Sequence, residues 1–81
     1  MQPNNRFEII IASEPDHERL VAEIYYDRKF ALLVSQERAV GQFDLETPGP
    51  GLDESLIARR VPLDLLQPMI KAACEQLQLS P

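Results

Sequence analysis

The chain has 81 residues, of which 44% are hydrophobic and 26% charged, and this balance is typical of a globular domain and excludes a mainly disordered chain. Thirteen acidic residues against eight basic ones give a net charge of −5, which disfavours nucleic acid as a partner because phosphates are neutralised by clustered Lys and Arg. A single cysteine excludes an internal disulfide and favours the cytoplasm, and no apolar run is long enough for a membrane span.

The amino-terminal region predicts a flexible tail followed by a strand. Residues 1–5 are polar and have nothing to pack, whereas residues 6–81 form one domain. From Arg6 to Ala12 the apolar side chains of Phe7, Ile9 and Ile11 alternate onto one side of an extended chain. Apolar residues on the other side as well favour a central position for this strand.

Residues 13–36 predict a β-hairpin, with one ambiguity at its start. The stretch from Ser13 to Asp16 has the signals of a helix start, and its alternative is a turn. We favour a strand from residue 19 to Tyr26, because residues 24–26 are β-favouring, and a second strand from Phe30 to residue 36. Folding the hairpin about Arg28 places Tyr26 and Phe30 on the same face.

A polar turn is expected over residues 37–41, and residues 42–47 alternate strictly. The alternation turns Phe43 and Leu45 inward and the two acids Asp44 and Glu46 outward, which indicates a half-buried fourth strand. The following Pro48 to Gly51 segment ends it, because proline supplies no ladder donor.

The carboxyl-terminal third predicts one short uncertain element and one helix. Residues 55–61 allow a helical turn or a short edge strand, of which we favour the strand. From Pro62 to Leu79 apolar residues recur at helical spacing, and Pro68 suggests that the regular helix begins there. The predicted fold is α+β: an antiparallel β-meander of four to five strands with one C-terminal α-helix packed on one face.

The residues that can carry chemistry each have a simpler structural explanation. His17 is the only imidazole and is expected in an exposed turn, and Cys74 lies among small residues of a packed helix. Asp44 and Glu46 project from one face of a strand, but no third metal ligand is visible. We therefore predict no enzyme activity, no catalytic residue, no metal site and no cofactor.

Two basic pairs, Arg28-Lys29 and Arg59-Arg60, lack the interleaved aromatic residues of a nucleic-acid surface. We expect them to pair with nearby acids or with a carboxylate of a partner. The Pro48 to Gly51 segment lacks the lysine and hydroxyl residues that end a phosphate-binding loop.

The outer face of the predicted hairpin is partly apolar, and such a patch on a small sheet often marks an interface. We predict a non-catalytic module that masks or inhibits another protein, in the manner of an immunity protein, antitoxin or inhibitor. A basic partner is favoured by the net charge. The predicted partner-binding residues are Val21, Glu23, Tyr25, Leu33, Asp44 and Glu46.

Two alternatives belong to other classes of function. One is a structural homodimer or accessory subunit, joined through the sheet face or a free strand edge. The other is a small ligand-binding protein or enzyme with a pocket between helix and sheet, which would use Tyr25 or Tyr26, His17 and an arginine.

Overall fold

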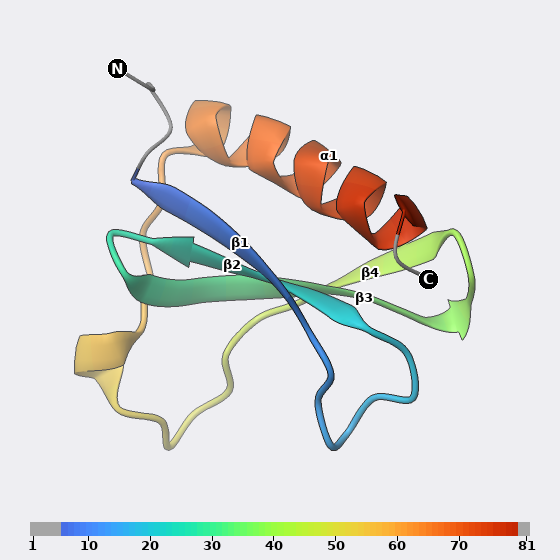
Figure 1. Cartoon of the computed structure of the whole chain (residues 1–81). Helices are drawn as coiled ribbons and strands as arrows, with labels where there is room; N and C mark the ends of the chain where they lie inside the picture. Colours follow the sequence, from blue (N-terminus) through green and yellow to red (C-terminus); the bar gives the residue numbers. More distant parts are fainter. Residues whose placement is uncertain (1–5, 80–81) are drawn as a thin grey trace.

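The computed structural model describes residues 6–79 and consists of a four-stranded antiparallel sheet with one helix across one face (Figure 1). The strands are neighbours in chain order, which confirms the predicted α+β meander with a C-terminal helix. The predicted tail at residues 1–5 lies outside the described residues. The elements are β1 (Phe7–Ala12), β2 (Val21–Tyr26), β3 (Lys29–Ala39), β4 (Gln42–Glu46) and α1 (Leu63–Leu79).

The main hydrophobic core lies between α1 and the sheet. Alternating side chains of the strands and helical-period side chains of α1 meet there, because each element has one continuous apolar face. The buried members of this core are Phe7, Ala22, Ile24, Ala31, Leu32, Val34, Ala73 and Leu77. We call the covered side the helix face of the sheet and the opposite side the outer face.

The first strand lies at the edge of the sheet, and its predicted central position is therefore wrong. β1 pairs only with β2, in the register Phe7 to Tyr26 and Ala12 to Val21. The apolar outer-face residue that suggested a central strand, Ile10, keeps 39% of its surface exposed. In this sheet, a strand with apolar side chains on both faces therefore lies at an edge.

The β2–β3 hairpin has a tighter turn than the sequence suggested. Asp27 and Arg28 both have positive φ, 52° and 66°, so the turn has two residues and Tyr26 pairs with Lys29. Tyr25 therefore pairs with Phe30, and the predicted same-face placement of Tyr26 and Phe30 is wrong. A bulge between Ile24 and Tyr25 shifts the register, so that Ile24 pairs with Leu32.

The third strand continues through the residues that were expected to form a turn. β3 runs to Ala39, and the reversal uses residues 40 and 41, with Gly41 at φ 87°. The fully buried Gln36 explains the extension, because its side-chain oxygen accepts a hydrogen bond from the Gly41 N–H at 3.0 Å. On β4, Phe43 packs on the core as predicted, whereas Leu45 remains 53% exposed.

The segment between β4 and α1 contains a single helical turn and one bridge. Glu54–Leu56 forms a 3-10 helix, and Ile57 makes one parallel bridge to Phe30, so the favoured fifth strand is reduced to this bridge. α1 begins at Leu63, with the Leu66 N–H donating to the Pro62 carbonyl at 2.9 Å. Pro68 therefore lies inside the helix and does not mark its start.

Candidate functional site

The outer face carries most of the predicted partner-binding residues in rows that cross the strands. The register places Ile10, Glu23, Leu33 and Glu46 in one row, because each is paired with the next across β1 to β4. Beside this row, Glu8 pairs with Tyr25. Figure 1 shows α1 above the sheet and the connections at residues 13–20 and 47–57 below it.

Only part of the predicted patch is accessible. Val21 is completely buried and Leu33 is 5% exposed, so neither side chain contributes to the surface of this structure. Glu23, Tyr25 and Asp44 are half-buried and Glu46 is exposed. The partner-binding role of these residues stays a prediction, and Val21 and Leu33 act in this conformation as packing residues of the outer face.

His17 lies in the segment between β1 and β2 and joins this segment to β4. Its Nε2 lies 2.9 Å from the Glu46 Oε2, and the same oxygen accepts the Ser35 hydroxyl at 2.7 Å. The hydrogen bond to Glu46 raises the pKa of His17, against the opposing effect of burial. The hydrogen bonds from Ser35 and His17 lower the pKa of Glu46. The His17 side chain is 10% exposed, so its predicted position in an exposed turn is wrong.

A second acidic cluster lies on the β2 side of the outer face. A side-chain hydrogen bond with Glu23 raises the pKa of Glu14, and burial adds to this effect. The Tyr25 hydroxyl donates to Glu23 at 3.1 Å, and burial is the main reason why the pKa of Tyr25 is raised. A cation brought near these two carboxyl groups would oppose this effect and lower the pKa of Glu14.

The acids of the sheet differ in how they are neutralised. Asp44 pairs with Arg38 at 2.9 Å, and Glu46 pairs with His17. Glu14 lies 3.8 Å from the Nδ1 of His17, whereas within residues 6–79 Glu8 and Glu23 form no ion pair. The outer face of β1 and β2 therefore carries two acids, Glu8 and Glu23, that have no cationic partner among the described residues.

Sequence reasoning missed Glu8, Ile10 and Glu14 as members of this surface. Glu8 and Ile10 alternate with the core residues of β1, so their period-2 pattern identified the face but not its accessibility. Glu14 belongs to a turn, and its approach to Glu23 depends on how residues 13–20 fold back. We call the set Glu8, Ile10, Glu14, Glu23 and Tyr25 the acidic outer surface.

The side chains that could carry catalysis or bind a metal have structural contacts instead. Asp44 pairs with Arg38, and Glu46 accepts hydrogen bonds from the buried Ser35 and from His17. Cys74 packs against the helix-face core, and burial raises the pKa of its thiol. Over residues 6–79, no group of three or more His, Cys, Asp or Glu side chains is arranged to hold a metal ion.

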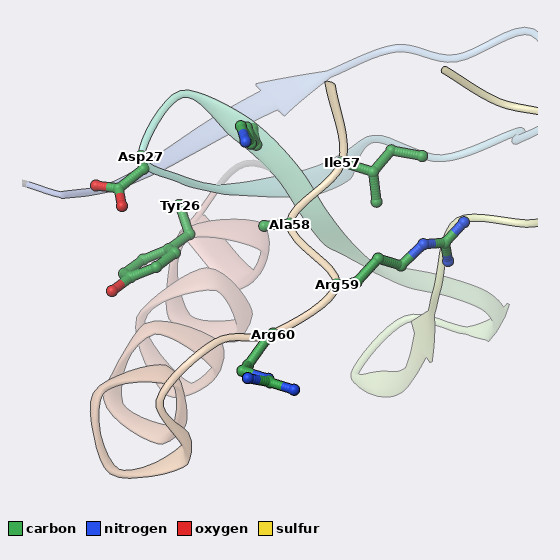
Figure 2. Close-up of a pocket in the computed structure, with 7 residues that line it drawn as sticks. Tyr26, Asp27, Ile57, Ala58, Arg59 and Arg60 are labelled. Atoms are coloured by element: carbon green, nitrogen blue, oxygen red, sulfur yellow. The ribbon is translucent and has the colours of Figure 1, made fainter. Parts of the chain in front are cut away.

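A pocket of about 220 Å³ lies at the end of the molecule formed by the β2–β3 turn. Figure 2 shows the extended segment of residues 57–60 running past Tyr26 and Asp27. As expected for its basic pair, Arg59 bonds an acid, Glu54, at 2.6 Å, and it also donates to the Pro48 and Gly49 carbonyls. The lining residues are Tyr26, Asp27, Lys29, Ile57, Ala58, Arg59 and Arg60.

Comparisons of the chain with protein-family models, with curated proteins and with solved structures found no match. Within residues 6–79, α1 and the short 3-10 helix both fall short of the length and apolar character that a bilayer span requires.

Proposed function

We propose that this chain is a non-catalytic module that binds and masks another protein through the acidic outer surface. The observation that supports the proposal is the charge of Glu8 and Glu23, which have no ion-pair partner among residues 6–79, beside two partly exposed apolar side chains, Ile10 and Tyr25. Protein interfaces commonly combine an aromatic or aliphatic centre with a charged rim. A partner with a basic surface fits this arrangement.

The pairing of the other acids narrows the surface relative to the one expected from sequence. Asp44 and Glu46 are held by Arg38, His17 and Ser35, so a partner's cation has to compete with bonds that already exist. Glu8 and Glu23 lack such a competitor among the described Arg and Lys residues. The binding surface is therefore centred on β1 and β2.

Charge reversal tests the surface against a matched control. The double variant Glu8→Lys/Glu23→Lys places like charges opposite a basic partner and is expected to weaken binding about tenfold or more, which corresponds to about 1.4 kcal/mol. The control Glu75→Lys changes the charge at an exposed position of α1, away from the proposed surface, and is expected to retain binding. The partner is first captured from a host lysate on the immobilised wild-type protein. Its affinity for each immobilised variant is then measured at several salt concentrations.

Two results of that measurement would contradict the proposal. One is an equal affinity of all variants, and the other is a salt dependence that is unchanged by the double variant. Circular dichroism of each variant verifies that the fold is retained, since Glu8 is exposed and Glu23 half-buried.

Proton linkage gives an independent test of the same surface. A cation brought to Glu14 and Glu23 favours the ionised form, so binding lowers the raised pKa of Glu14 and releases a proton. Affinity is therefore expected to increase as the pH rises above 4.5, the ordinary pKa of this carboxyl, and the increase is expected to be smaller in Glu14→Gln. A pH-independent affinity would argue against contact at this pair.

The homodimer is the second candidate, and open sheet edges favour it. β1 and β4 each have one strand neighbour, and beside the β4 edge Val40 is 60% and Leu45 53% exposed. A symmetric pairing of β4 edges would cover these side chains. Light scattering tests it: a monomer at high micromolar concentration excludes an obligate dimer.

A further inference from the structure

The pocket at the β2–β3 turn has an excess of positive charge in a molecule that is acidic as a whole. Three cationic residues and one carboxylate line it, which leaves two positive charges in excess. Arg6 forms an ion pair with the lining carboxylate, Asp27, and Glu54 forms one with Arg59. These two outer partners cancel each other, so the excess remains.

Two of the lining cations have no internal partner. Within residues 6–79, neither Lys29 nor Arg60 takes part in an ion pair. Both are exposed, so they keep their donors free for a ligand. An arginine supplies a planar fork of donors and a lysine a point charge, a combination that suits the oxygens of a phosphate group.

The walls around these cations are held in place by other contacts. The Ala58 N–H donates to the Phe30 carbonyl at 2.8 Å, and the neighbouring Ile57 is 6% exposed. The ring of Tyr26 contacts the ring of Phe7, at 4.8 Å between centroids, and the guanidinium of Arg6, at 5.0 Å from the ring centroid. A pre-formed wall of this kind lowers the ordering cost of binding.

We infer that this pocket binds the phosphate group of a small phosphate ester, with Lys29 and Arg60 as the charged ligands. A phosphate monoester carries about −1.5 to −2 charges at pH 7, which matches the excess of two positive charges. A volume of about 220 Å³ is below that of pockets that enclose a whole drug-sized ligand. The pocket therefore accommodates the phosphate and the atoms next to it.

The site is separate from the acidic outer surface, so the two proposals fail independently. The pocket is lined by residues 26, 27, 29 and 57–60, whereas the acidic outer surface belongs to β1, β2 and the β1–β2 connection. Tyr25 and Tyr26 are adjacent in sequence but point to opposite faces of β2, because side chains alternate along a strand.

Amide chemical-shift titration of the full chain with inorganic phosphate tests the inference. We expect saturable changes confined to residues 26–30 and 57–60, and at least about tenfold weaker binding of acetate, which carries one charge. Arg60→Gln and Lys29→Gln are each expected to weaken phosphate binding about tenfold, the loss of one charge-assisted hydrogen bond.

Lys71→Gln is the matched control, since Lys71 is an exposed cation on α1 outside the pocket. It is expected to leave phosphate binding unchanged. The inference is overturned if Lys71→Gln weakens binding as much as Arg60→Gln, if acetate binds as well as phosphate, or if shifts follow every Arg and Lys without saturation. The spectrum of each variant reports folding in the same experiment.

Discussion

His17 holds the β1–β2 connection against β4 through one carboxylate. Its hydrogen bond to Glu46 joins residues 29 positions apart in the chain. The Glu46 carboxylate also accepts a hydrogen bond from the buried Ser35 on the outer face. The Glu37 carboxylate fixes the same connection from β3, because it accepts hydrogen bonds from the N–H groups of Glu18 and Arg19 at 2.8 and 2.9 Å. Two carboxylates thus place the residues that lie below the sheet.

The stabilising effect of His17 is expected to depend on pH. Because the pKa of His17 is raised in the folded protein, its contribution is fully present below the unfolded value of about 6.5 and is lost as the pH rises through the folded value. The difference in unfolding free energy between wild type and His17→Gln should therefore be larger at pH 5.5 than at pH 8.5. Urea unfolding at several pH values measures it.

Glu46→Gln is the control for the same experiment. It removes the carboxylate that raises the pKa of His17, so the pH dependence of the His17→Gln difference should shrink in its background. A difference that grows with pH, or that persists unchanged in Glu46→Gln, would contradict the proposed ion pair.

The turn between β2 and β3 is strained by its side chains. Asp27 and Arg28 adopt the left-handed region of backbone conformation, which costs a residue other than glycine about 1–2 kcal/mol of conformational energy. Two-residue hairpin turns of this geometry favour Asp-Gly. Arg28→Gly is therefore expected to increase the free energy of unfolding by about 1 kcal/mol in denaturant titration.

Gly41→Ala gives the opposite test at the β3–β4 turn. Its φ is 87° and a Cβ at this position meets no atom within 4 Å, so only backbone strain opposes alanine. We expect a loss of about 1 kcal/mol. If Arg28→Gly and Gly41→Ala changed the free energy of unfolding in the same direction, the assignment of strain to these turns would be contradicted.

At the scale of elements, α1 contains a proline that interrupts its hydrogen bonding. Pro68 has no N–H to donate to the carbonyl four residues earlier, that of Asp64. Because Pro68 is exposed, Pro68→Ala is expected to restore this bond and stabilise the protein by about 1–3 kcal/mol in thermal and urea unfolding.

Pro62→Ala separates this effect from a general effect of proline. Pro62 precedes α1 and contributes its carbonyl, which any residue can supply. Its replacement should change stability much less than Pro68→Ala does. A loss of stability in Pro68→Ala would show that the ring packs in a way that this structure does not contain.

The elements that were predictable are those with a long periodic pattern. The apolar stripe of α1 and the alternation in β1, β2 and β4 identified these elements and the buried side chains Ala73 and Leu77. The β2–β3 register near the turn was not predictable, because Asp-Arg is an unusual pair for two consecutive positive φ values. The two-residue turn sets the pairing of Tyr25 with Phe30, and the bulge beyond it then shifts the register to the pairing of Ile24 with Leu32.

The candidate surface was less predictable than the fold. Alternation placed Val21 and Leu33 on the outer face, which is correct, but their burial depends on connections that have no periodic pattern. The contact of His17 with Glu46 and that of Glu14 with Glu23 likewise join residues distant in sequence. The pocket at residues 26, 27, 29 and 57–60 forms because the Ile57 bridge to Phe30 brings these two segments together.

At the scale of the whole molecule, basic residues gather at one end of the sheet, whereas the acidic outer surface lies on the face opposite α1. Five of the eight basic residues lie at or near the β2–β3 turn: Arg6, Arg28, Lys29, Arg59 and Arg60. The acidic outer surface lies on β1, β2 and the connection between them. One small domain thus presents an acidic face for a basic protein and a separate cationic pocket for a phosphate group, as we propose.

Amide chemical-shift mapping of the bound partner on the isotope-labelled protein tests the proposed protein-binding surface most directly. We predict the largest changes at Glu8, Ile10, Glu23 and Tyr25, and their loss in Glu8→Lys/Glu23→Lys but not in Glu75→Lys. Largest changes on α1 or along the β4 edge, with the outer face of β1 and β2 unaffected, would contradict the account.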